Sequence, residues 1–554
     1  MKGYQIDRRG VVSTTAVDLF GKAGWWMSLL LIAGLPSVSY AVQQDAEYYV
    51  QEKRFGKQWT AEDKQVRDKL AALEKKFGKK PNVIYILADD TGYTELGAYG
   101  GGIRGFKTPN LDQMARQGMR FLSYYSQPAC TTTRIALQTG RFPVRNGITG
   151  IIMPGTQGIG LRNYEVTIAE LLSEAGYTTA MYGKWHMGGS LDDPEYIPTN
   201  NGYDEAEWSE GNPLWWGYNK GVKPTDRDGY MTRAHFTWPP GPDAQPWDLG
   251  GVMRATKGGK PEIVYPYSIE KYNSYDTEVA DNTIDFIKRN AKGDKPFFVY
   301  YAGKGNHFFG ANPKFMNTPA GTNNAAQMTE HDYNVGRVLD TLKELGIEEN
   351  TLVIWSSDNG PMYAMHPHGG YSLLKGEKSD TWEGGIRVPA IAWWPGMIEA
   401  FQEEDGIVDV TDWFTTVASI AGVKDKIPND RVTDGVDQSS LLLLENVKSR
   451  RDWNFHYNHS GLEAVRKDQI KFRMPTAPGE AVFGFDQAHH YFYNLYYDPA
   501  ERFPNMVEIG LWAGPAFQKI IQDHKKMIEK FPHQKAQPGH KVEFDYPFDP
   551  DPTK

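Results

Sequence analysis

The sequence predicts an α/β protein in which a doubly wound main domain is followed by a smaller C-terminal domain. Apolar runs typical of strands buried on both faces alternate with segments whose apolar residues recur at helical spacing. Strands are expected at residues 82–88, 178–182, 296–301 and 351–355. Because ligands of such sheets bind beyond the carboxyl ends of the strands, the residues that follow them are the candidates for chemistry.

Two of the intervening helices carry end signals of their own. Thr167 and Glu170 form a capping box ahead of a helix that Gly176 closes. Apolar residues at helical spacing over 335–342 mark another helix, which ends at Gly346. This alternation of strand and helix is what indicates a doubly wound sheet.

Composition and charge exclude several classes of protein. At 554 residues and 40% hydrophobic content, the chain is long enough to bury a large core. Its net charge of −9, without a basic stripe, argues against a nucleic-acid partner. A single cysteine rules out an intrachain disulfide and cysteine-rich zinc sites.

Residues 1–41 have the pattern of an export signal. Basic residues precede the apolar run 25–35, and Ser39 and Ala41 flank a bulky residue, as a signal-peptidase site requires. The run is short for a bilayer span, so we expect an exported, periplasmic or secreted protein with no stable membrane span after cleavage. An uncleaved anchor is the alternative.

Residues 42–80 are charged and predict a helical extension ahead of the main domain. Thr60 with Asp63 resembles a capping box. Apolar residues recur at helical spacing after it: Val66, Leu70, Leu73 and Phe77. Two interpretations stay open, a helix packed on the main domain and a dimerisation arm.

Oxygen-bearing side chains follow two of the predicted strands. Asp89 and Asp90 come directly after the first strand, and Asp358 and Asn359 follow the strand that begins at Thr351. Two adjacent carboxylates repel each other unless a cation lies between them. The four side chains form a hard-cation set, suited to Ca²⁺ or Mg²⁺ rather than zinc. A solvated turn or a helix cap is the alternative.

The only cysteine, Cys130, opens the run 130–141. Arg134 stands four residues later, so a helix that begins at Cys130 places both on one face. Its start would direct unpaired N–H groups and a positive dipole end toward a bound anion. A small buried hydrophobe is the alternative. The run resembles the signature of the type I sulfatases, Cys-x-Pro/Ala-x-Arg followed by Thr-Gly-Arg, with Thr132 where Pro or Ala is usual.

In that family, part of the alkaline-phosphatase superfamily, a maturation enzyme oxidises the cysteine to formylglycine, whose hydrated aldehyde is the nucleophile. The resemblance therefore implies formylglycine at Cys130 and one Ca²⁺ per chain. Asp-Asp and Asp-Asn-Gly are the family's metal-ligand motifs. The implied ligand set is Asp89, Asp90, Cys130, Asp358 and Asn359.

Two further motifs agree with the family pattern. The motif Gly-Lys-Trp-His ends at His186. The resemblance implies that Lys184 bridges the sulfate and the nucleophile, and that His186 contacts the second hydroxyl of the formylglycine hydrate. In extended chain these two side chains would point to the same side. His307 matches the histidine that touches the ester oxygen and would protonate the leaving group, with Lys304 as a nearby competitor.

A last motif, at residues 375–389, resembles the block Gly-x-Lys-x-x-Thr-x-Glu-Gly-Gly-x-Arg-x-Pro. It implies that Lys378 binds the sulfate and the leaving oxygen, whereas Lys375 is interpreted as a surface charge. With the cation, Arg134 would hold and polarise the nucleophile. All five motifs occur in the family's order.

The resemblance implies hydrolysis of an aryl or carbohydrate sulfate ester, whether a small molecule or a glycan. It also implies a mixed sheet in a catalytic domain at 81–450, and an antiparallel sheet, a helix and a tail at 451–554. Two alternatives stay open. Related enzymes hydrolyse phosphonate monoesters or phosphodiesters with the same nucleophile, and a chain with unconverted Cys130 would be a non-catalytic sulfated-glycan-binding protein.

Substrate specificity has weaker signals. A long segment rich in Trp, Gly and Pro either lines the site, where indoles stack on sugar or aryl rings, or packs on itself. Its tryptophans are Trp208, Trp215, Trp216, Trp238 and Trp247. His366 and His368 lie between two motifs and either reach the substrate or stay on the surface.

Overall fold

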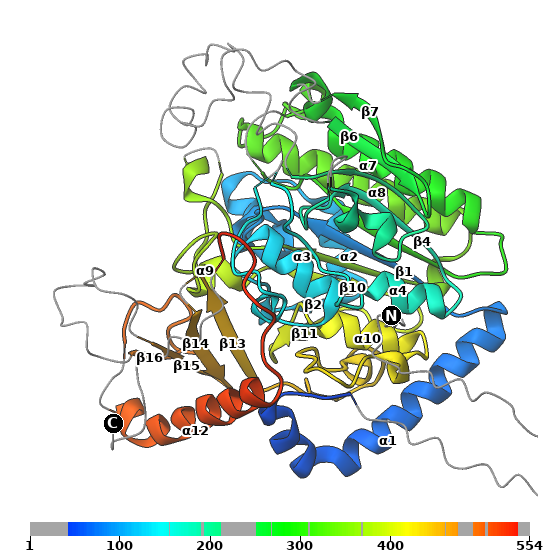
Figure 1. The fold of residues 1–554 in the computed structure, drawn as a ribbon. Helices are drawn as coiled ribbons and strands as arrows, with labels where there is room; N and C mark the ends of the chain where they lie inside the picture. The colour runs from blue at the N-terminus through cyan, green and yellow to red at the C-terminus, as the bar shows by residue number, and fades with distance from the viewer. Residues whose placement is uncertain are drawn as a thin grey trace, which may run out of the picture.

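The computed structural model describes residues 42–153, 156–189, 193–211, 251–266, 269–307, 311–366, 369–459, 461–474, 491–504 and 508–540. A large mixed sheet with helices on both faces is joined by a smaller antiparallel sheet (Figure 1). The predicted fold class is confirmed. The predicted export signal, 1–41, lies outside the described residues. Among the helices that are described, none combines the length and apolarity needed to cross a bilayer.

The large sheet has ten described strands, and its centre is parallel. β9, β1, β8, β4 and β5 run in one direction, whereas β10, on one side, and β6, on the other, run against them. In spatial order the strands are β11 (Gln402–Glu404), β2 (Met119–Phe121), β10 (Ala390–Trp393), β9 (Thr351–Ser357), β1 (Asn82–Ala88), β8 (Phe297–Ala302), β4 (Thr178–Lys184), β5 (Glu205–Ser209), β6 (Gly251–Thr256) and β7 (Glu262–Pro266).

Alternating residues of β1 face two separate apolar cores, which is why its sequence is apolar throughout. Val83 and Tyr85 belong to one core, and Ile84 and Ile86 belong to the other. The first core contains residues of α3 (Cys130–Thr139), α4 (Ile168–Glu174), α10 (Asp412–Ile420) and α11 (Ser439–Leu443). The second contains residues of α2 (Pro109–Arg116), α7 (Ile269–Asn290) and α8 (Asn323–Glu344).

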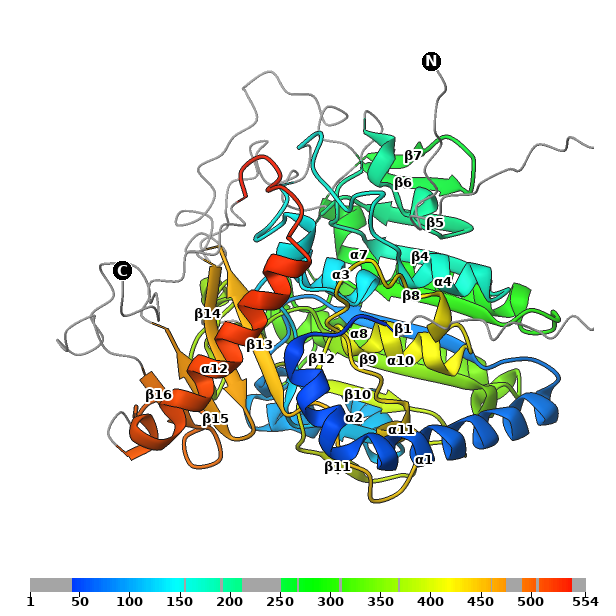
Figure 2. The same cartoon turned by 60° about the horizontal axis from the view of Figure 1, so that its bottom comes forward.

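The C-terminal part has a core of its own. Its four-stranded antiparallel sheet consists of β13 (Trp453–Asn458), β14 (Gly461–Lys467), β15 (Ile470–Arg473) and β16 (Tyr491–Asn494), with α12 (Glu508–Lys530) packed against it (Figure 2). The rings of Phe472, Phe492 and Phe517 pack together, with centroids 4.9–5.7 Å apart. The strand pair and helix predicted here are confirmed.

The segment after α12, expected as an extended tail, packs on the main domain where it is described. Gln537 is buried, and its amide nitrogen Nε2 donates to the carbonyl of Gly160 at 2.9 Å. Its backbone N–H donates to the carbonyl of Gly147, also at 2.9 Å. Residues 541–554 lie outside the described part of the chain.

The predicted N-terminal helix, α1 (Ala46–Phe77), begins earlier than the expected capping box. Its cap is Asp45, whose carboxylate accepts from the N–H of Ala46 at 2.7 Å. Thr60 therefore lies inside the helix, where its hydroxyl donates to the carbonyl of Gly56. Trp59 and Val66 are buried, and the helix packs against α11 and α12, so it lies on the body of the protein.

Buried charges fix α1 to the body of the protein. Arg450 Nη2 lies 3.2 Å from Glu62 and 2.6 Å from Asp63, both on α1. Nearby, Lys424 Nζ lies 2.7 Å from Asp437 Oδ2. Burial alone would raise the pKa of Asp437, but Lys424 and Arg450 lower this pKa to about 2. The Asp437 carboxylate is therefore stabilised in the folded chain.

We expect Asp437→Asn to lower the free energy of unfolding by roughly 2 kcal/mol at neutral pH, since one pKa unit corresponds to ~1.4 kcal/mol. The folded pKa lies below the unfolded value near 3.8. The contribution is therefore complete above that value and is lost as the pH falls toward 2. Urea unfolding at neutral pH and at about pH 3 should show the difference from wild type shrinking by about half. Asp425→Asn, at an exposed position next to Lys424, is the control.

Candidate functional site

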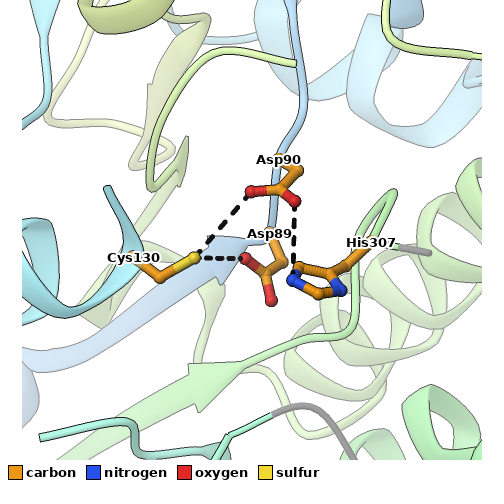
Figure 3. Close-up of side chains that lie close together, drawn as sticks. All are labelled: Asp89, Asp90, Cys130 and His307. Atoms are coloured by element: carbon orange, nitrogen blue, oxygen red, sulfur yellow. Dashed lines mark hydrogen bonds and ion pairs between the residues drawn. The ribbon is translucent and has the colours of Figure 1, made fainter. Parts of the chain in front are cut away.

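The sequence-predicted site residues converge at the carboxyl edge of the parallel strands. Asp89 and Asp90 follow β1, and Asp358 follows β9. Lys184 ends β4, and Cys130 is the first residue of α3. Figure 3 shows Asp89, Asp90, Cys130 and His307 facing one another, and one ligand atom from each lies within 4.8 Å of the others.

Cys130 is 1% exposed, and its thiol donates toward two carboxylates. Sγ lies 3.2 Å from Asp89 Oδ1 and 3.8 Å from Asp90 Oδ1. Burial raises the pKa of the thiol well above its ordinary value, and the nearby charges of Asp358 and Asp89 raise it further. The unmodified side chain is therefore a protonated thiol, a poor nucleophile.

Two lysines pair with the adjacent aspartates. Lys184 Nζ lies 2.6 Å from Asp89 Oδ2, and Lys378 Nζ lies 2.7 Å from Asp90 Oδ1. Burial would raise the pKa of Asp89, but Lys184 and other nearby cations hold this pKa well below its ordinary value. Burial would lower the pKa of Lys378, but Asp90 raises it well above the usual range. Lys378 is therefore charged, and the amines of both lysines lie against carboxylates of the site.

Asp358 and Asn359 join the same cluster through hydrogen bonds. Asp358 Oδ2 accepts from Arg134 Nη2 at 2.8 Å, and Asp358 Oδ1 accepts from the N–H of Asp90 at 3.1 Å. Asn359 Nδ2 donates to Asp90 Oδ1 at 2.7 Å. Burial and the neighbouring Asp89 raise the pKa of Asp358. Every predicted metal ligand is thus part of one buried group.

These residues fit a hard divalent cation. The carboxylates of Asp89, Asp90 and Asp358 are buried together, and such a group repels itself without positive charge. Asn359 Oδ1 is buried and has no hydrogen-bond partner among the described residues. A carbonyl oxygen with carboxylates is the donor set of Ca²⁺ and Mg²⁺.

His307, rather than Lys304, reaches the cluster. His307 Nε2 lies 3.5 Å from Asp90 Oδ2. Lys304 Nζ instead lies 3.6 Å from Glu330 and 4.8 Å from the centre of the Tyr272 ring. The geometry therefore favours the histidine of the two candidates from the sequence.

A buried aspartate that the sequence analysis missed supports this loop. Asp276, on α7, accepts from the backbone N–H of Lys304 at 2.9 Å and from Asn334 Nδ2 at 3.0 Å. It also lies 3.2 Å from His331 Nδ1. No motif marks Asp276, because its partners are 28 to 58 residues away in the sequence.

His186 is near the cluster, but not through the expected extended backbone. Its φ of 56° lies in the left-handed region, so the chain is not extended at His186. His186 Nε2 lies 2.9 Å from the carbonyl of Ile152. Burial lowers the pKa of His186 well below its ordinary value, and Lys184 and Arg134 lower it further. The imidazole is therefore neutral.

The candidates for substrate contact have mixed outcomes. Trp208, a residue of β5, is fully buried in the first apolar core. His366 Nε2 lies 2.9 Å from the carbonyl of Gly370, and its ring stacks on Tyr371. Lys375, interpreted from the sequence as a surface charge, is half-buried, and its Nζ lies 3.4 Å from the centre of the Trp382 ring. The candidates outside the described residues are Trp215, Trp216, Trp238, Trp247 and His368.

A family model described as Sulfatase matches residues 81–423. The chain belongs to the sulfatase family. The matched range contains every predicted site residue of this sulfatase.

Known sulfatases resemble the chain over most of their length. N-acetylgalactosamine-6-sulfatase of Rattus norvegicus is 33% identical over 485 residues, which cover 81% of this chain and 86% of the relative. Steryl-sulfatase of Rattus norvegicus is 33% identical over 441 residues, covering 70% and 74%. The crystal structure of PsFucS1 sulfatase from Pseudoalteromonas sp. is similar with a TM-score of 0.76 at 33% identity, covering 86% of this chain and 96% of that one. This sulfatase is accordingly a sulfuric ester hydrolase.

The low reactivity expected of the buried Cys130 thiol can be tested in sulfatase whose cysteine has not been modified. In chelator-treated native protein, we expect iodoacetamide to alkylate Cys130 at least ~10-fold more slowly than in urea, since each unit of raised pKa reduces the thiolate fraction tenfold. Intact mass reads the reaction without ambiguity, because the chain has one cysteine. Equal rates in native and unfolded protein would contradict the inert, buried thiol.

Proposed function

We propose that this sulfatase hydrolyses a sulfate ester with a formylglycine made from Cys130 and one Ca²⁺ per chain. The observation that carries the proposal is the position of Cys130. It begins α3 and lies within hydrogen-bonding reach of Asp89, where Lys184 and Arg134 also converge. A nucleophile made there would be surrounded by groups that bind an anion.

The cation would be held by Asp89, Asp90, Asp358 and Asn359, together with the modified residue 130. Bound there, Ca²⁺ supplies positive charge that polarises the nucleophile and the sulfate oxygens. The buried side-chain amide oxygen of Asn359, which has no hydrogen-bond partner among the described residues, supports this set. Arg134 is fully buried, and its guanidinium holds Asp358 at 2.8 Å, so it fixes one ligand in place.

Formylglycine, as its hydrate, would supply one hydroxyl that attacks sulfur and a second hydroxyl that later loses its proton. That loss would break the C–O bond to the transferred sulfate, so that sulfate leaves and the aldehyde is restored. Lys184 and Lys378, whose amines pair with Asp89 and Asp90, would neutralise the charge that develops on the sulfate oxygens. His307 would protonate the departing oxygen of the ester, and its imidazole must first take up a proton, because burial lowers its pKa well below the ordinary value. His186, held neutral by burial, accepts the proton of the second hydroxyl. The proximity of these side chains to the same cluster supports each role.

The substrate class that we favour is a carbohydrate sulfate ester, with aryl sulfates as convenient assay substrates. The relative named N-acetylgalactosamine-6-sulfatase, 33% identical over most of both chains, supports this choice. The proposal also requires a maturation enzyme that converts Cys130, and export of the chain through its N-terminal signal. Paired rates on aryl sulfate and aryl phosphonate esters distinguish this function from phosphonate hydrolysis.

Conversion of Cys130 is tested by the mass of the tryptic peptide 121–134. In protein from a host with maturation activity, we expect a peptide lighter than its cysteine form that an aldehyde-trapping hydrazide captures. Cys130→Ala should show neither capture nor sulfate-ester turnover. Unmodified cysteine alone, with tight binding of sulfated glycan and no turnover, would instead favour the binding-protein alternative.

The cation requirement is tested by chelation and by removing one ligand charge. We expect chelator to lower kcat on an aryl sulfate at least ~100-fold, with recovery on adding Ca²⁺. Asp358→Asn should weaken Ca²⁺ binding roughly 10- to 100-fold, since it also loses the Arg134 ion pair. Asp340→Asn, at an exposed pair with Lys343, is the matched control. Full activity of the chelated enzyme would contradict the metal assignment.

A further inference from the structure

We propose that the three consecutive threonines after Cys130 are positioning residues of the sulfatase site. Their catalytic meaning rests on the function proposed above. Thr131, Thr132 and Thr133 are all buried at the start of α3. Successive residues of an α-helix are rotated by about 100°, so three neighbouring side chains reach three different parts of the structure. Each hydroxyl fixes a different group relative to Cys130.

Thr131 connects α3 to the loop that orients His186. Its hydroxyl oxygen accepts from the backbone N–H of Ile152 at 3.1 Å. The carbonyl of the same residue, Ile152, lies 2.9 Å from His186 Nε2. Ile152 therefore links α3, which carries the proposed nucleophile, to His186, the proposed general base. Thr131 holds Ile152 in place.

Thr132 closes the turn that enters the helix. Its hydroxyl donates to the carbonyl of Ala129 at 2.7 Å and accepts from the N–H of Ala129 at 3.2 Å. Ala129 is the N-cap of α3 and has no side-chain oxygen to cap the helix. Proline or alanine, usual at this position in the family, could not make these bonds. Thr132 thus fixes the backbone directly before Cys130.

Thr133 connects α3 to the end of β9. Its hydroxyl accepts from the N–H of Gln127 at 2.9 Å and is hydrogen-bonded to the carbonyl of Asp358. The Asp358 carboxylate is one of the proposed metal ligands. Thr133 therefore sets the distance between the nucleophile and one ligand of the cation.

Replacement by valine removes each hydroxyl while keeping the shape, and serine restores it. A buried N–H left without its acceptor is destabilising, so the loop or strand end shifts to find another partner. A misplacement of about 1 Å in a catalytic group can reduce turnover roughly 100-fold. The effect should therefore appear in kcat more than in KM.

The test compares Thr131→Val, Thr133→Val and Thr132→Ala with the serine variants at all three positions. Thr283→Val is the control, because Thr283 is buried in α7 and its hydroxyl donates to Val279 of its own helix. Two readouts are needed: kcat and KM on an aryl sulfate, normalised to the formylglycine content of peptide 121–134, and hydrogen exchange of individual amides.

We expect Thr131→Val and Thr133→Val to lower kcat about 10- to 100-fold with KM changed less than about 3-fold. Exchange should rise selectively at the amide of Ile152 in the first variant, of Gln127 in the second and of Ala129 in Thr132→Ala. Serine should restore kcat to within about 3-fold of wild type. Thr283→Val should leave kcat and these three amides unchanged.

The outcomes separate this inference from the proposed function. Valine variants that keep wild-type kcat, or exchange that rises uniformly along the chain, would overturn the positioning roles alone. A wild-type enzyme without sulfate-ester turnover would overturn the proposed function and, with it, the catalytic meaning of the threonines. Selective exchange together with a loss of kcat supports the inference.

Discussion

The structure depends on one electrostatic constraint, the burial of three carboxylates at a single point. Asp89, Asp90 and Asp358 are each at most 1% exposed. Burial disfavours the charged form of each, and their mutual repulsion adds to that cost. Positive charge must therefore be brought in from elsewhere in the chain. Lys184 and Lys378 bring it from two different elements, β4 and the loop before α9 (Glu383–Ile386).

The register of the central sheet meets this constraint by bringing distant segments together. β1 and β9 are parallel neighbours, with Ala88 opposite Ser357. The next residues, Asp89 and Asp358, therefore leave the sheet side by side, and the N–H of Asp358 donates to the carbonyl of Ala88 at 3.0 Å. A slip of one residue would turn one of the carboxylates away from the cluster. The apolar packing on both faces of β1 thus also positions the charges.

The strands have local signals in the sequence, and so do the motif residues that gather at the carboxyl edge of the sheet. An apolar run identifies β1, and an Asp-Asp pair after it identifies the edge where ligands bind. Other features depend on partners far away in the chain. Asp276 supports the His307 loop through residues that no motif links to it. His186 and Asp90 adopt left-handed backbone conformations, with φ of 56° and 52°, that their residue types do not require. Thr60 and Asp63 match a capping-box pattern, whereas the residues at the true helix start, Asp45, do not. The sequence therefore placed the start of the helix too late.

The same electrostatics favour a modified residue over a cysteine nucleophile. A thiolate at Cys130 would lie 3.2 Å from the Asp89 carboxylate, and like charges at that distance repel strongly in a buried site. The cations that could stabilise it, Lys184 and Lys378, are already paired with carboxylates. A neutral hydroxyl avoids this repulsion and gains from the positive charges only as negative charge moves onto the sulfate group. The site is therefore better suited to a neutral nucleophile made from Cys130 than to the cysteine itself.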